Sequence, residues 1–166
     1  MHSPDIEKEF EKHISENEML IYKVCSIYAY TDADRQDLFQ EIVIQLWNSF
    51  QKFKGDAKFS TWLYRVAINT AITGLRKQKD IITSYEPAAL PANIKDDSTG
   101  MEEEERLQYL HAAIEKLNQF EKAIVMLYME DRSYEEMEDI LGLSQGNLRV
   151  KMNRIKQKLR DLTKNN

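Results

Sequence analysis

Basic side chains crowd the C-terminal end of the chain, and their spacing suits contacts with nucleic acid. From Ser144 to Asn166 there are seven Lys or Arg residues against one acid, Asp161. Lysine and arginine neutralise phosphates, and arginine can also donate two hydrogen bonds to the edge of a guanine. The alternative is an amphipathic hairpin with a solvated basic face, and the strong charge asymmetry argues against it.

A second group of polar and aromatic side chains lies between residues 51 and 79. Trp62 is followed at helical spacing by Arg65, Asn69, Thr73 and Arg76, and a basic, aromatic loop precedes it. Bases stack on aromatic rings, phosphates meet cations, and asparagine can hydrogen-bond to a base edge. These residue types are what a site for single-stranded nucleic acid needs.

The residue pattern does not favour catalysis or metal binding. There is no glycine-rich phosphate loop, no Ser, His and Asp in a triad order, and no paired catalytic acids on a shared face. Three scattered histidines are never paired with cysteine at ligand spacing. We therefore predict no enzyme activity, no metal, no cofactor and no small-molecule substrate.

The single cysteine and the hydropathy pattern bear on location. Cys25 excludes an intrachain disulfide and lies in an apolar stripe, which predicts a small buried thiol rather than a reactive one. No run approaches the ~18 apolar residues of a membrane span, and the acidic start does not resemble a signal peptide. A cytoplasmic protein without direct membrane insertion is expected.

A helix-turn-helix is expected to hold the basic segment in place. Ser133 followed by Glu136 predicts a capping box, and apolar residues then recur at helical spacing until Gly142. After a short turn, Ser144 can cap a second helix. Its apolar stripe is Leu148, Met152, Ile155, Leu159 and Leu162. In this layout the second helix enters the major groove.

The rest of the chain predicts further helices and one break. We expect one helix at about 5–30, one at about 33–51, and one at 61–79 capped by Ser60. Two more helices precede the helix-turn-helix, so that four helices close a small core of their own. The fold class is therefore all-α, with two small helical domains joined by a flexible acidic linker.

The predicted linker carries more than the whole negative charge of the chain. Residues 81–105 hold seven acids and one base, whereas the full chain has a net charge of −5. The linker ends in the acidic run Glu102 to Glu105. That run is either the first turn of the following helix, where the helix dipole favours acids, or a strip that mimics nucleic acid.

Three stretches in this order resemble bacterial RNA polymerase sigma factors of the small, extracytoplasmic-function type. They are DADRQDLFQEIVIQLW at 32–47, KFKGDAKFSTWLYRVAINTAITGLRK at 52–77 and SYEEMEDILGLSQGNLRVKMNRIKQKLR at 133–160. The resemblance implies a domain at 1–80 that binds core polymerase and melts the minus-ten promoter element. It further implies a linker at 81–105 and a helix-turn-helix domain at 106–166 for the minus-thirty-five element.

The resemblance also implies three sets of site residues. Those for core polymerase are Asp37, Gln40 and Glu41. Those for the minus-ten element, including its melted non-template strand, are Lys58, Phe59, Ser60, Thr61, Trp62, Arg65, Asn69 and Arg76. Those for the duplex minus-thirty-five element are Ser144, Gln145, Asn147, Arg149, Lys151, Asn153, Arg154 and Lys158. An anti-sigma factor that covers these surfaces is a further implied partner.

Two positions depart from the family pattern. Glu138 stands on the first helix of the helix-turn-helix where a small residue is usual, and we expect its carboxylate to reach solvent. Asn118 follows Leu117 where a proline is common, which affects only how that turn is set. The competing interpretation of the whole chain is a stand-alone helix-turn-helix regulator that binds duplex operators as a dimer.

Overall fold

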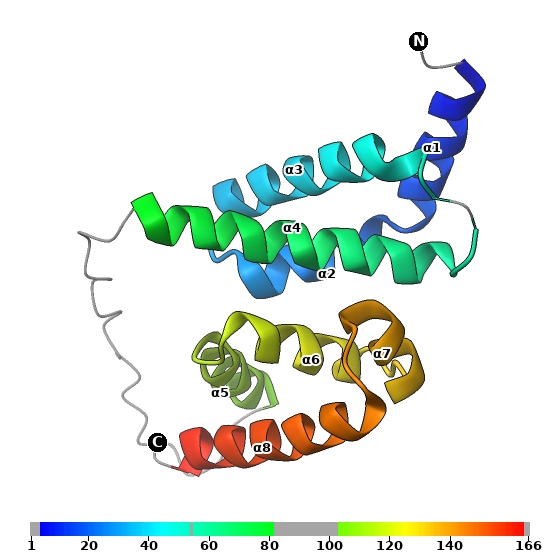
Figure 1. The fold of residues 1–166 in the computed structure, drawn as a ribbon. Coiled ribbons are helices and arrows are strands. Elements are labelled where there is room, and N and C mark those ends of the chain that lie inside the picture. The colour runs from blue at the N-terminus through cyan, green and yellow to red at the C-terminus, as the bar shows by residue number, and fades with distance from the viewer. Residues whose placement is uncertain (1–3, 54, 82–102, 165–166) are drawn as a thin grey trace.

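The structure is a computed structural model that describes residues 4–53, 55–81 and 103–164, and within them all regular structure is helical (Figure 1). The helices of the N-terminal unit are α1 (Pro4–Glu16), α2 (Glu18–Tyr28), α3 (Asp32–Phe50) and α4 (Phe59–Ile81). Those of the C-terminal unit are α5 (Glu103–Glu115), α6 (Gln119–Met129), α7 (Tyr134–Leu141) and α8 (Gln145–Lys164). The predicted all-α fold class is confirmed.

The N-terminal unit is built on three mutually packed helices. α2, α3 and α4 contact one another, and α1 packs across α3 (Figure 1). The facing sides of these helices carry apolar residues that are fully buried, such as Ile21, Ile42, Leu46 and Leu63. These residues recur at helical spacing, so one apolar stripe on each helix forms the core.

The single helix predicted at about 5–30 is wrong, because the chain breaks at Asn17. That residue has φ −120° and ψ 15°, and its side-chain amide donates to the His13 carbonyl oxygen at 2.8 Å. The amide thereby satisfies one of the carbonyls left free at the end of α1. Phe10 packs edge-on against Trp47 and Phe50, which holds α1 across the end of α3.

The predicted Ser60 cap is also wrong, because α4 begins earlier, at Phe59. The Trp62 amide already donates to the Lys58 carbonyl oxygen at 3.2 Å, so Ser60 lies inside the first turn. Packing explains the earlier start. The Phe59 ring stacks on His13 with a centroid distance of 4.4 Å, which draws this turn onto α1.

The helix-turn-helix has the predicted boundaries. The Ser133 and Ser144 hydroxyls accept hydrogen bonds from the amides of Glu136 (3.1 Å) and Asn147 (3.2 Å). Gly142 ends α7 in the left-handed region at φ 74°, which costs glycine little. The Ser133 box is only half formed, because the Glu136 carboxylate pairs with Arg132 at 3.2 Å instead.

A complete capping box occurs where the sequence departs from the family pattern. The Asn118 side chain accepts from the Glu121 amide at 2.8 Å, and the Glu121 carboxylate accepts from the Asn118 amide at 3.0 Å. Asparagine therefore does more than set the turn. Its side chain satisfies one free amide at the start of α6, and the Glu121 carboxylate satisfies a second.

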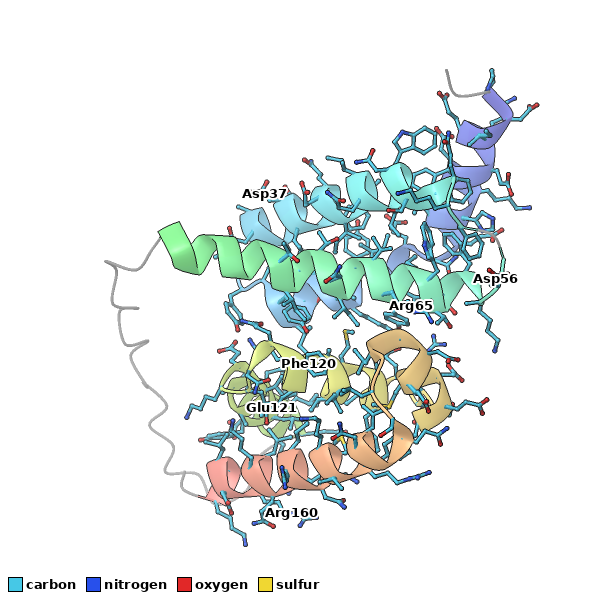
Figure 2. All side chains as sticks on the ribbon, in the orientation of Figure 1. Asp37, Asp56, Arg65, Phe120, Glu121 and Arg160 are labelled. Carbon is cyan, nitrogen blue, oxygen red and sulfur yellow. The ribbon has the colours of Figure 1, made fainter. Side chains whose placement is uncertain are left out.

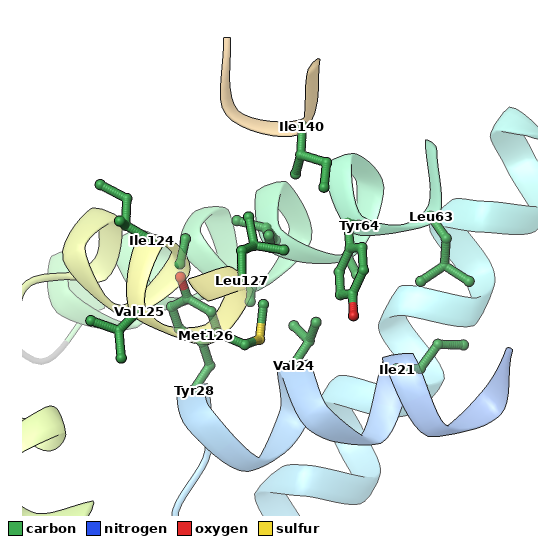
Figure 3. Packing of buried hydrophobic residues seen from close by; sticks show 14 of the residues in the cluster. Ile21, Val24, Tyr28, Leu63, Tyr64, Ile124, Val125, Met126, Leu127 and Ile140 are labelled. Atoms are coloured by element: carbon green, nitrogen blue, oxygen red, sulfur yellow. The ribbon is translucent and has the colours of Figure 1, made fainter. Parts of the chain in front are cut away.

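The two units share one hydrophobic cluster rather than closing two separate cores. α4 packs on α7, and α2 packs on α6. Figure 3 shows Tyr64 of α4 between Val24 of α2 and Ile140 of α7. The linker predicted at 81–105 lies mostly outside the described residues, which resume at Glu103. Glu103, Glu104 and Glu105 form the first turn of α5, in agreement with the first interpretation of the acidic run.

Replacing Asn118 tests the capping box of α6. We expect Asn118→Ala to lower the free energy of unfolding by about 1 kcal/mol, because the Glu121 amide loses the side-chain oxygen that accepts its hydrogen bond. Thermal or urea denaturation measures the loss. The matched control is Asn48→Ala at an exposed position inside α3, where alanine favours the helix and no loss is expected. Equal effects of the two changes would contradict the capping role.

Cys25 should be chemically inert in the folded protein. The side chain is 1% exposed, and burial raises the pKa of its thiol to about 11, so the reactive thiolate is scarce near neutral pH. We expect a thiol reagent at pH 8 to label the native protein at least ~100-fold more slowly than the urea-unfolded chain. Comparable rates would show that the thiol is accessible.

Candidate nucleic-acid and polymerase interfaces

The predicted minus-thirty-five residues occupy two sides of α8. Successive residues turn by about 100°, so Arg149 and Asn153 lie along one edge of the exposed face, whereas Lys151 and Arg154 lie along the other. Arg149, Asn153 and Arg154 are exposed, and Lys151 is half-buried. The helix therefore presents two polar rows, which suits a helix lying in a groove with base edges and phosphates around it.

Arg149 is held by the first residue of α7. Its guanidinium lies over the Tyr134 ring, 5.1 Å from the centroid, while the side chain remains exposed. A cation over an aromatic face is stabilised by roughly 0.5–1 kcal/mol at an exposed site. Tyr134 thus limits the positions that the guanidinium samples without covering it.

The opposite edge of α8 faces the start of α6. Lys151 and Arg154 line a cavity of about 400 Å³ together with Phe120 and Glu121. Figure 2 labels Phe120 and Glu121 on α6, above α8. The Lys158 ammonium pairs with the Glu121 carboxylate at 3.2 Å. The Lys158 ammonium is therefore bound to the capping box of α6 and is not free.

The first turn of α8 leaves room for close approach. Of the predicted residues there, Ser144 and Asn147 are exposed and Gln145 is half-buried. A side chain at Gly146 would meet nothing within 4 Å, so the fold does not require glycine there. Val150, one turn further, is 49% exposed and lies between the two polar rows. The sequence interpretation missed Val150, although its place outside the apolar stripe was the available signal.

The predicted minus-ten residues separate into three places. Lys58, Thr61 and Arg65 line a cavity of about 390 Å³ whose other wall is α7. Arg65 is exposed and donates from Nε to the Asp139 carbonyl oxygen, and Figure 2 shows it on the α7 side of α4. Thr61 is buried, at 7% exposure.

A second place is an aromatic cluster at the start of α4. Phe59 and Trp62 contact each other and Phe53, with ring centroids 5.1–5.7 Å apart. Phe59 and Trp62 are both half-buried, and Ser60 beside them is half-buried too. Their rings mainly build the fold here and offer only part of their faces to a base.

The third place joins the predicted DNA and polymerase residues. Asn69 is exposed in a groove of about 490 Å³ between α3 and α4, and Glu41 lines the same groove. The Glu41 carboxylate accepts a hydrogen bond from Gln45 at 3.0 Å. The side chain of Arg76 lies outside the described residues.

The predicted polymerase-binding residues lie on an open face of α3. Asp37, Gln40 and Glu41 are all exposed. Figure 2 labels Asp37 on the side of α3 that faces away from the C-terminal unit. Spacings of three and four residues place the three side chains on one helix face, where a helical partner can meet them together.

Glu138 is half-buried on α7. Among the described residues, no group of three or more His, Cys, Asp or Glu side chains is placed to hold a metal ion. None of the described helices combines the length and apolar character that crossing a membrane requires.

Two family models match the chain and define a class of transcription initiation protein. Sigma-70 region 2 matches residues 13–81, and Sigma-70 region 4 matches residues 107–159. The chain belongs to the sigma-70 family of RNA polymerase sigma factors, of the extracytoplasmic-function type. Such proteins direct RNA polymerase to promoters and are non-enzymatic.

Similar proteins cover nearly the whole chain. RNA polymerase sigma factor SigV of Bacillus subtilis (strain 168) is 26% identical over 159 residues, covering 91% of this chain and 89% of that protein. The ECF RNA polymerase sigma-E factor of Escherichia coli (strain K12) is 29% identical over 149 residues, covering 82% and 78%.

Solved structures agree on the fold. The sigma factor RpoE from Bartonella quintana, in complex with the anti-sigma factor NepR, aligns with a TM-score of 0.73 at 18% identity. The alignment covers 95% of this chain and 98% of that one. CnrH, in complex with the cytosolic domain of CnrY, aligns with a TM-score of 0.65 at 17% identity, covering 96% and 90%.

Glu138 offers a test of the α7 packing. Because the side chain is half-buried, Glu138→Ala should change the free energy of unfolding by no more than about 0.5 kcal/mol. Thermal denaturation measures this change. A large gain in stability would mean that the carboxylate is buried and strained, and the comparison Glu135→Ala at an exposed position gives the baseline.

Proposed function

We propose that this sigma factor recognises promoters through three surfaces of its own chain. The exposed α3 face with Asp37, Gln40 and Glu41 binds core RNA polymerase. The start of α4 with the preceding loop binds the minus-ten element and its melted non-template strand. The exposed face of α8 reads the duplex minus-thirty-five element. The observation that carries the proposal is that α8, in the matched region 4, presents exposed cations while Ser133, Gly142 and Ser144 set its helix-turn-helix.

The division of labour follows the two units. Residues 1–80 bind core polymerase and melt DNA, 106–166 hold the upstream duplex, and 81–105 connect them. Each unit alone binds DNA weakly, and the second contact becomes intramolecular once polymerase has oriented the first. The chain performs no chemical step itself and uses no cofactor. Its place of action is the cytoplasm, where polymerase and promoters are.

The α8 surface gains one residue beyond those named from the sequence. Val150 is exposed between Arg149 and Arg154, at the centre of the outward face. An apolar side chain in the major groove can contact the methyl group of thymine, whereas arginine contacts guanine. We therefore expect the minus-thirty-five element to contain a thymine near the guanine that the arginine contacts.

An anti-sigma factor is a further proposed partner. One solved structure of similar fold holds the sigma factor RpoE with the anti-sigma factor NepR, and another holds CnrH with the cytosolic domain of CnrY. In this chain, the exposed α3 face and the α8 face are the surfaces that such a partner would have to cover.

The alternative function is a stand-alone regulator that binds duplex operators as a dimer. Such a regulator needs the helix-turn-helix, but it has no role for residues 13–81. Those residues match Sigma-70 region 2, which is one of the two family matches. Tight and specific binding of duplex promoters without polymerase would favour it.

Run-off transcription tests the proposal directly. With purified core polymerase and a library of promoter fragments, the protein should produce start-site-specific transcripts whose sequences reveal both elements. Arg149→Ala should lower transcription from those promoters by about tenfold or more, because a bidentate contact to guanine contributes roughly 1–3 kcal/mol of discrimination.

The matched control is Arg160→Ala, also an exposed arginine of α8 but near its end, outside the proposed reading positions (Figure 2). Its effect should be small and similar at all promoters. Absence of transcripts with the unaltered protein, together with no co-elution with core polymerase, would favour the alternative function, that of a stand-alone regulator.

A further inference from the structure

Two lysines of α8 are held on opposite edges of the helix by the two ends of α6. α6 packs on α8 (Figure 1). Lys158 on one edge pairs with the Glu121 carboxylate in the first turn of α6 at 3.2 Å. Lys156 on the other edge contacts Tyr128 near the end of α6. Because successive residues turn by about 100°, the two lysines point about 200° apart around α8.

The two partners differ in charge, which decides what each lysine can still bind. Glu121 is an acid and offsets the charge of Lys158. Tyr128 is neutral: the Lys156 ammonium lies 4.6 Å from its ring centroid and donates to its phenol oxygen at 3.1 Å. A ring face and a hydroxyl oxygen hold a cation in place without neutralising it. Lys156 therefore keeps its positive charge for an anion from outside the chain.

The Tyr128 hydroxyl adds a second donor at the same place. Its oxygen accepts from Lys156, and a phenol also carries one proton to donate. Within the part of the chain that the structure describes, that proton has no acceptor. Tyr128 is 40% exposed, so the hydroxyl is open to solvent. An ammonium and a hydroxyl that converge at a protein surface are donors from which the oxygens of a nucleic-acid phosphate accept.

The pair lies along the same edge of α8 as the proposed guanine contact, Arg149. Arg149 precedes Lys156 by two turns and is likewise held over a tyrosine ring, that of Tyr134. Recognition helices contact base edges with their N-terminal residues, and seven residues of helix advance by about 10 Å. The major groove is about 12 Å wide. When Arg149 reaches a base, Lys156 therefore lies at the border of the groove, where the sugar–phosphate strand runs.

We propose that Tyr128 and Lys156 form a binding site for one backbone phosphate of the duplex at the minus-thirty-five element. The inference rests on the proposed function, because it takes Arg149 as a residue that enters the groove. Lys156 supplies the charge. Tyr128 positions the ammonium and donates its own proton to the phosphate. The site anchors α8 on the strand whichever bases lie in the groove, and neither residue is among those predicted from the sequence for this element.

The salt dependence of promoter binding tests the site in the complete holoenzyme. Core polymerase is reconstituted with full-length variants, and the dissociation constant of a promoter duplex obtained from run-off transcription is measured at several KCl concentrations. Lys156→Ala should weaken binding about three- to tenfold and reduce the slope of log affinity against log salt by about 0.9, the contribution of one phosphate contact. Lys156→Arg should keep the slope.

The matched control is Lys164→Ala, which removes the same charge from an exposed position about two turns further along α8. Its slope should equal that of the unaltered protein. Equal slopes for Lys156→Ala and Lys164→Ala would overturn the inference.

Tyr128→Phe separates the hydroxyl from the charge. The ring stays beneath the ammonium, so affinity should fall about two- to fivefold while the slope stays unchanged. Tyr128→Phe and Lys156→Ala should each weaken binding equally for the original promoter and for one with altered minus-thirty-five bases, because a phosphate contact is independent of sequence. A loss confined to the original promoter would mean that the pair acts only through base recognition, and the phosphate site would be wrong.

Neutral phosphates locate the contact on the DNA. Methylphosphonate linkages, each of which removes one phosphate charge, are placed in turn along both strands of the minus-thirty-five element. One position should weaken binding of the unaltered holoenzyme but not that of the Lys156→Ala holoenzyme, because both changes remove the same contact. Equal sensitivity of the two holoenzymes at every position would contradict the proposal.

Two other outcomes have separate meanings. Weaker co-elution of Lys156→Ala with core polymerase, with an unchanged methylphosphonate pattern, would assign the pair to a protein contact and overturn the phosphate site. Absence of transcription and of promoter binding with the unaltered protein would instead count against the proposed function. Failure of the inference and failure of the proposed function are therefore distinguishable.

Discussion

Burial of Tyr64 is the interaction on which the arrangement of the two units depends. The ring is fully buried where α7 packs on α4, and buried residues of both units belong to one hydrophobic cluster. Burial raises the pKa of its phenol, while the Arg132 guanidinium acts in the opposite direction. The cation over the ring and its ion pair with Glu136 link this apolar contact to the start of the helix-turn-helix.

Elements set by local chemistry were predictable from the sequence. The helix-turn-helix followed from two serine caps and one glycine, because hydroxyl caps and a left-handed residue act within a single turn. The break at Asn17 and the start of α4 at Phe59 were not predictable in the same way. Both depend on aromatic contacts between distant segments, of Phe10 with Trp47 and of Phe59 with His13, which no local pattern contains.

The site was foreseeable in part for the same reason. Helical periodicity places Arg149, Arg154 and Val150 on the exposed face of α8. The predicted minus-thirty-five residues were chosen for their polar or charged side chains, so Val150 was not among them. Periodicity also placed Trp62, Arg65 and Asn69 on one helix. It could not separate them into an aromatic cluster, an interdomain cavity and a groove shared with Glu41, because those surroundings come from α1, α7 and α3.

The two helices of the helix-turn-helix carry opposite charges. A minus-ten site must be cationic to bind phosphates, and an exposed cationic surface binds any nucleic acid without regard to sequence. On α7, Glu135, Glu136 and Asp139 line the cavity opposite Lys58 and Arg65, whereas the exposed face of α8 is basic. Carboxylates of the same chain beside these cations lower the net positive charge of the cavity, and they thereby weaken its non-specific attraction for phosphates.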